Sequence, residues 1–105
     1  MIGNVATVVE PWGFECGNMI NGTWDGNTSI GATEASYAFT GDTVNSNKNS
    51  VYKNNKCSGG TWGFELAHGS FNTFTDNGFH AVVERFHNNG DYDQSHDIET
   101  GSYSY

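Results

Sequence analysis

The sequence predicts an all-β protein, and three observations support this fold class. Helix-forming residues are scarce, with one leucine and four basic residues against 14 glycines in 105 residues. The tetrapeptide Trp-Gly-Phe-Glu occurs twice, at residues 12–15 and 62–65. A third pattern, a small polar residue, a large apolar one, two mostly polar ones and then Asn or Gly, occupies residues 23–27, 50–54, 73–77 and 97–101.

The spacing of these segments predicts the architecture. Their last residues, 27, 54, 77 and 101, are 23 to 27 residues apart. A period of about 25 residues without a helical pattern inside it is typical of a β-solenoid in which each repeat forms one coil. We therefore expect one domain over residues 1–105, a short right-handed parallel β-helix of about four coils. The repeat units are approximately 13–39, 40–62, 63–86 and 87–105, with extra loop residues within 41–48.

Stacked coils place like residues on like, about 4.8 Å apart. We expect one inward apolar column made of Trp24, Val51, Phe74 and Ile98. We also expect a ladder of hydrogen-bonded turn asparagines made of Asn27, Asn54 and Asn77, ended by Gly101. Asn47 lies outside this ladder, so its substitution is predicted to cost less stability than that of Asn54.

The repeat resembles a known family. Residues 49–55 and 63–77 look like coils of the NosD-like and pectate-lyase-like right-handed β-helix proteins. Residues 21–27, Asn-Gly-Thr-Trp-Asp-Gly-Asn, are similar to a phrase common in the same superfamily, which includes phage tailspikes. The resemblance covers residues 12–80 and consists of structural ladders, so it implies the β-helix fold rather than a catalytic motif.

A small antiparallel β-barrel of the lipocalin-like meander type is the alternative fold. Residues 76–78 and 88–91 both carry hairpin signals, and strands would then follow at 79–87 and 97–105. Gly22-Thr23-Trp24 also resembles the Gly-x-Trp of lipocalin first strands. Such a barrel would bind a small apolar ligand.

Two glutamates form the first candidate site. Glu15 and Glu65 alternate with apolar neighbours, so both are predicted to face outward at one coil position, with Asp42 a candidate member between them. The hypotheses are a Ca²⁺ site or the acid/base pair of a polysaccharide-cleaving enzyme. A solvated acidic stripe is the simpler interpretation, which we favour. Because no Lys or Arg falls at an equivalent position to complete a lyase site, we assign no catalytic residue.

Aromatic residues and loop carboxylates give two weaker candidates. Trp12 and Trp62 precede their strands at corresponding corners and would form a paired platform for a sugar. Asp91 and Asp93 lie in segment 90–97, whose alternating oxygen donors resemble a Ca²⁺-binding loop that lacks the closing glutamate. We find no metal-ligand spacing among the histidines His68, His80, His87 and His96. No cofactor other than Ca²⁺ is expected.

The net charge of −8 limits the partners. All three lysines lie within residues 48–56, so nothing neutralises a run of phosphates, which argues against nucleic acid and an anionic membrane surface. A neutral glycan, a metal cation or a basic protein surface remains compatible with this charge. Residues 1–10 lack the basic start and long apolar core of a signal peptide. Cys16 and Cys57 fit either a disulfide or two buried free thiols.

These observations lead to a functional expectation. We predict a non-catalytic structural, adhesive or glycan-binding module that presents a surface outside the cell or on a virion. The open ends of a solenoid expose unpaired backbone groups, so self-association or a larger assembly is expected. The alternatives are a fragment of a polysaccharide-acting enzyme of the β-helix superfamily and the ligand-binding barrel.

Overall fold

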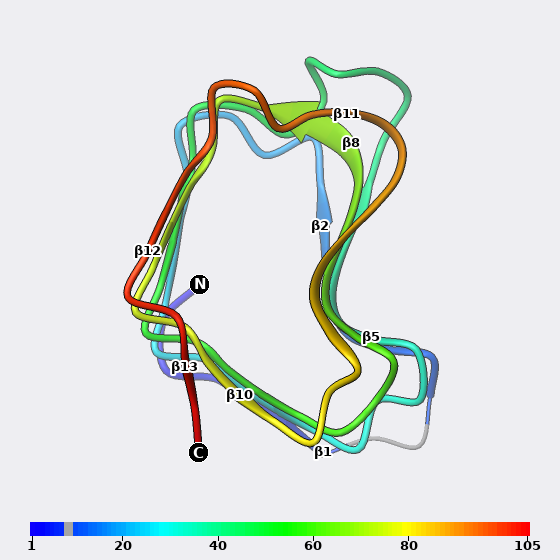
Figure 1. Ribbon diagram of the computed structural model, residues 1–105. Coiled ribbons are helices and arrows are strands. Elements are labelled where there is room, and N and C mark those ends of the chain that lie inside the picture. The colour runs from blue at the N-terminus through cyan, green and yellow to red at the C-terminus, as the bar shows by residue number, and fades with distance from the viewer. Residues whose placement is uncertain (8–9) are drawn as a thin grey trace.

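The computed structural model describes residues 1–7 and 10–105 and is a parallel β-solenoid of about four turns (Figure 1). The first sheet contains β1 (Val5–Thr7), β4 (Thr28–Ile30), β7 (Lys56–Ser58), β10 (Gly78–His80) and β13 (Tyr103–Ser104). The second sheet contains β2 (Trp12–Gly17), β5 (Ala35–Thr40), β8 (Trp62–Ser70) and β11 (Glu84–Asp93). The third sheet contains β3 (Thr23–Asp25), β6 (Val51–Lys53), β9 (Thr73–Thr75) and β12 (Ile98–Thr100). Within the described ranges there is no helix long and apolar enough to cross a membrane.

Every strand pair among the described residues is parallel and joins neighbouring coils. In Figure 1 the chain runs anticlockwise while its C-terminal end comes towards the viewer, which is the sense of a right-handed helix. The predicted right-handed parallel β-helix is therefore confirmed. The antiparallel barrel is wrong, because Gly78 pairs in parallel with Lys56 and residues 89–90 lie inside β11 rather than in a hairpin turn.

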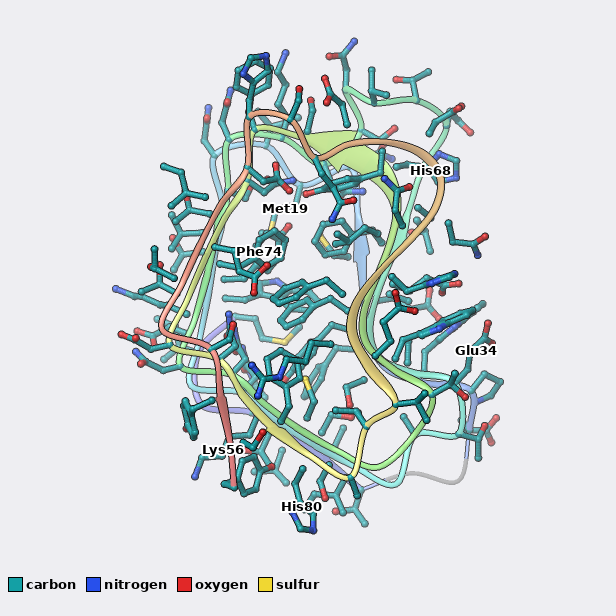
Figure 2. The ribbon with its side chains drawn as sticks, viewed as in Figure 1. Met19, Glu34, Lys56, His68, Phe74 and His80 are labelled. Carbon is teal, nitrogen blue, oxygen red and sulfur yellow. The ribbon has the colours of Figure 1, made fainter. Side chains whose placement is uncertain are left out.

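Stacked aromatic rings fill the interior. The second sheet contributes rings whose neighbouring centroids are 4.8 to 5.3 Å apart, from Phe14, Tyr37, Phe64 and Phe86. The third sheet contributes rings at equivalent positions of successive coils, from Trp24, Tyr52 and Phe74. Rings of the two sheets meet edge to face, as Phe64 and Phe74 do with centroids 5.2 Å apart. Figure 2 shows Phe74 pointing into the coil.

The predicted apolar column is wrong at Val51 and Ile98. Both lie in an outward row of the third sheet, where Val51 is half-buried and Ile98 is 56% exposed. The inward positions belong to Tyr52 and Glu99, each one residue further along the chain. A shift of one residue moves a strand side chain to the opposite face, so a small error in the alignment of coils reversed both assignments.

A ladder of asparagine side chains follows the third sheet, as predicted, but with a different member. The ladder consists of Asn4, Asn27, Asn55 and Asn77. The backbone N–H of each member donates to the side-chain oxygen of the next, at 2.9 to 3.0 Å. The prediction of Asn54 is wrong, because this exposed residue lies one position earlier. It belongs to a row of left-handed turn residues, with φ between 54° and 70°, made of Gly26, Asn54, Asp76 and Gly101.

A second ladder, which the sequence does not predict, precedes the third sheet. It consists of Gly22, Ser50, Asn72 and Asp97. The backbone N–H of each member donates to the side-chain oxygen of the next, at 2.9 to 3.1 Å. Hydrogen-bonded side chains therefore border the third sheet on both sides.

Asn47 is a buried structural residue, contrary to its predicted minor role. Its Oδ1 accepts a hydrogen bond from the backbone N–H of Met19 at 3.0 Å. Its Nδ2 donates to the carbonyl oxygens of Thr40 and His68, both at 2.8 Å. These bonds fasten segment 41–48 to the coils on either side, and their loss would leave buried backbone groups without partners.

Candidate functional site

Two outward rows of side chains cross the second sheet, whose strands β2, β5 and β8 lie on the right-hand side of Figure 1. The aromatic row contains Trp12, Ala35, Trp62 and Glu84. The carboxylate row contains Glu15, Ala38, Glu65 and His87. Both rows run across the strands, along the solenoid axis, so neighbouring members are about 4.8 Å apart.

The repeated Trp-Gly-Phe-Glu segment needs a glycine at its second position, because the backbone there lies against the first sheet and leaves no room for a side chain. A Cβ added at Gly63 would lie 2.4 Å from a ring carbon of Phe79, and one added at Gly13 would lie 2.1 Å from the Oγ of Ser29. Glycine therefore lets the second sheet begin close against the first. The phenylalanine that follows enters the core, and the flanking Trp and Glu take their places in the two rows.

The two tryptophans of the aromatic row lie two coils apart. Trp12 is 38% exposed, and Trp62 is half-buried. The Trp62 indole stacks on the imidazole of His87, with centroids 4.0 Å apart and ring planes 4° from parallel. His87 also lies 2.8 Å from Glu84, between Nδ1 and Oε1, so three side chains of this face hold one another in place.

The two glutamates of the carboxylate row differ in their surroundings. Glu15 is exposed, whereas Glu65 is only 7% exposed and its Oε2 accepts a hydrogen bond from Asn89 Nδ2 at 2.9 Å. Ala38 takes the position between them, so the placement of Asp42 in this row is wrong. Asp42 lies beyond the end of β5, and its backbone N–H donates to the Oγ of Ser46 at 2.9 Å. The register is lost there because residues 41–48 form an extra loop.

The alanines between the larger residues shape this face. Ala35 and Ala38 occupy the coil that separates Trp12 from Trp62, and both are fully buried. Because a methyl group is short, the larger side chains of the coils before and after close over this step. The described residues form no enclosed pocket.

The candidate metal ligands are not gathered into one site. Among residues 1–7 and 10–105 no group of three or more His, Cys, Asp or Glu side chains is placed to hold a metal ion. Asp91 pairs with His68 across the strands, and Asp93 Oδ1 accepts hydrogen bonds from the Ser95 hydroxyl at 2.6 Å and backbone N–H at 2.9 Å. These hydrogen bonds lower the pKa of Asp93. A Ca²⁺ ion on this chain stays a prediction.

The cysteines are free thiols in the core rather than a disulfide. Cys16 donates to Asn47 Oδ1 at 3.1 Å, and its burial raises its pKa to about 11. Burial also raises the pKa of Cys57. Neither thiol is accessible in the folded chain, so both are unreactive packing residues.

Sequence reasoning missed three members of this face: Glu84, His87 and Asn89. The last coil reads Glu-Arg-Phe-His at residues 84–87, where the coil before it reads Trp-Gly-Phe-Glu, so only the phenylalanine marks the equivalence. That shared phenylalanine was the signal available. Asn89 lies where the pairing of β11 with β8 becomes irregular, between Asn88 and Asp91, and no repeat pattern predicts its position.

No protein-family model matches this chain, and no curated protein or solved structure does so either. The assignment of a parallel β-solenoid therefore comes from the strand pairing of this chain alone. The function has to be argued from the two rows on the second sheet.

Proposed function

We propose that this protein is a non-catalytic glycan-binding module, and that its binding surface is the outward face of the second sheet. One observation carries the proposal. Trp12 and Trp62 share one row, and Glu15 and Glu65 share the row beside it. Aromatic and hydrogen-bonding groups are thus repeated together along the solenoid axis.

The two rows offer complementary contacts for a sugar. Indole rings provide flat apolar surfaces against which the C–H groups of a sugar ring pack, here at Trp12 and at the face of Trp62 opposite His87. The exposed carboxylate of Glu15 accepts hydrogen bonds from sugar hydroxyl groups, and such charge-assisted bonds are the stronger kind. Glu65, which is 7% exposed and bonded to Asn89, contributes mainly its negative charge. Because Trp62 is held by His87 and Glu65 by Asn89, little side-chain freedom is lost on binding.

Two further observations support a binding rather than a catalytic role. The aromatic and carboxylate rows contain no lysine or arginine, whereas polysaccharide lyases of the β-helix fold generally need a basic residue. The resemblance of residues 12–80 to NosD-like, pectate-lyase-like and tailspike coils consists of structural ladders and brings no catalytic motif with it. A location outside the cell or on a virion, and assembly with further copies, stay predictions.

A panel of immobilised neutral and acidic polysaccharides tests the proposal. The wild-type chain should be retained by at least one polysaccharide, and Trp12→Ala and Trp62→Ala should each reduce retention. Phe71→Ala is the matched control, because Phe71 is 44% exposed but lies between β8 and β9, outside both rows. Retention unchanged in both tryptophan variants would contradict the proposed surface. Turnover of a bound polysaccharide, abolished by Glu15→Gln or Glu65→Gln, would replace binding with the enzyme alternative.

A further inference from the structure

We infer that the glycan bound by this face is a linear chain of non-acidic sugars that lies along the solenoid axis and contacts Trp12 and Trp62 together. This inference rests on the proposed function and adds the class, length and direction of the ligand. The direction follows from the aromatic row, which crosses the strands of the second sheet.

The spacing of the tryptophans sets the length. Trp12 on β2 and Trp62 on β8 are separated by one strand, β5, so their backbone positions are about 9.6 Å apart, twice the spacing of neighbouring strands. A single sugar ring is shorter than this backbone spacing, so contact with both tryptophans calls for a chain of sugars. A chain of about three sugars places its first and third rings over the two tryptophans at this spacing.

The residue between the two indoles does not project beyond them. Ala35 is the member of the aromatic row on β5, and Ala38 is the member of the carboxylate row. Both methyl groups are buried, so neither rises between Trp12 and Trp62. A ligand that ran along one strand instead would meet a single tryptophan, since the outward residue that follows Trp12 on β2 is Glu15.

The charge of the face selects against acidic sugars. Glu15 lies beside Trp12, and Glu65 and Glu84 lie beside Trp62, so each aromatic position has a carboxylate neighbour. All four basic side chains of the protein contact groups outside the two rows; the pairs are Lys48–Phe71, Lys53–Asp25, Lys56–Tyr105 and Arg85–Ser104. Uronic acid groups on this face would therefore meet carboxylates without a nearby cation.

A length series measures the first part of the inference. Neutral β-1,4-linked glucose oligosaccharides of one to six sugars are titrated into the intact protein by calorimetry, with the best polysaccharide of the panel as a reference probe. Affinity should rise steeply at about three sugars, the length that spans the two indoles. Trp12→Ala and Trp62→Ala should each remove this step and lower the affinity of longer chains roughly two- to tenfold. The Phe71→Ala control should keep the step.

The outcomes separate this inference from the proposed function. If the polysaccharide binds but affinity does not depend on length, or the step survives in both tryptophan variants, the glycan does not lie along the axis and this inference alone is overturned. If no oligosaccharide or polysaccharide of the panel binds, the proposed function falls with it.

An acidic oligosaccharide tests the second part. A galacturonate oligomer of the same length should bind more weakly than the neutral one at low salt, and added salt should reduce the difference. Glu15→Gln, which removes an exposed charge, should narrow the difference as well. Equal or tighter binding of the acidic oligomer to the wild-type protein would overturn the selection against acidic sugars.

Discussion

The second and third sheets each have four strands, but they are built differently. In the third sheet every strand has three residues and pairs residue for residue with its neighbours. The second sheet has strands of six, six, nine and ten residues, and its last pairing is irregular between Asn88 and Asp91. Two ladders border the third sheet, whereas two outward rows with aromatic and charged members cross the second. In the function proposed above, the third sheet maintains the stack and the second sheet presents side chains to a ligand.

The largest contrast is expected between an inward and an outward position of the third sheet. Phe74→Asp places an unpaired carboxylate among buried rings and should cost more than about 4 kcal/mol, enough to abolish cooperative unfolding. Val51→Asp puts the same group on the half-buried outward row and should cost about 1 kcal/mol. Urea unfolding followed by circular dichroism measures both. Equal losses would mean that the inward and outward rows are assigned wrongly.

A smaller effect is expected from the first ladder. Asn55 accepts two hydrogen bonds from Asn27 and donates one to the carbonyl oxygen of Trp24, so Asn55→Ala should cost about 2–3 kcal/mol. Asn54→Gly is the matched control, because glycine tolerates the φ of 56° and the Asn54 side chain is exposed. We expect that control to change the unfolding free energy by less than about 0.5 kcal/mol. A larger loss for Asn54→Gly than for Asn55→Ala would exchange the roles of the two residues.

The sequence predicts the register of the second sheet better than that of the third, because the repeated segments of the second sheet can be aligned in one way only. In the second sheet the identical Trp-Gly-Phe-Glu segments allow one alignment only, and the register of Trp12 with Trp62 and of Glu15 with Glu65 follows from it. In the third sheet the adjacent asparagines 54 and 55 allow two alignments. They differ by one residue, and nothing local distinguishes a buried amide from an exposed one.

The remaining errors have tertiary causes. The side chain of Asn47 fastens the loop at residues 41–48 to the solenoid, and its hydrogen-bond partners come from three other segments of the chain. The repeat pattern of the sequence therefore gives no sign of the structural role of Asn47. His87 enters the candidate site through its stack on Trp62 from the neighbouring coil. Contacts of this kind depend on which coils are neighbours, and they become predictable only after the register is known.

The smallest effect is expected at Asp97, the last member of the second ladder. Burial raises its pKa, although hydrogen bonds from the Tyr92 hydroxyl at 2.6 Å and the Asn72 backbone N–H at 2.9 Å favour its charged form. A carboxyl group with a raised pKa stabilises the fold fully below its ordinary pKa of 3.8, and this contribution is lost as pH rises through the raised value. Asp97→Asn keeps an oxygen for Asn72 and should flatten the dependence of Tm on pH as pH rises from 3.8 through the raised pKa of Asp97. An unchanged slope in the variant would assign the pH dependence to other carboxyl groups.

The tryptophan indole N–H resonances test most directly whether a ligand binds on the second sheet and leaves the third sheet unaffected. The three tryptophans of the chain comprise Trp12 and Trp62 on the outward face of the second sheet and Trp24 in the core behind the third. Titration of ¹⁵N-labelled protein with a neutral oligosaccharide should shift the Trp12 and Trp62 resonances together and leave that of Trp24, which is 4% exposed, in place. A titration that moves neither Trp12 nor Trp62, while signals of the first or third sheet shift, would contradict the account.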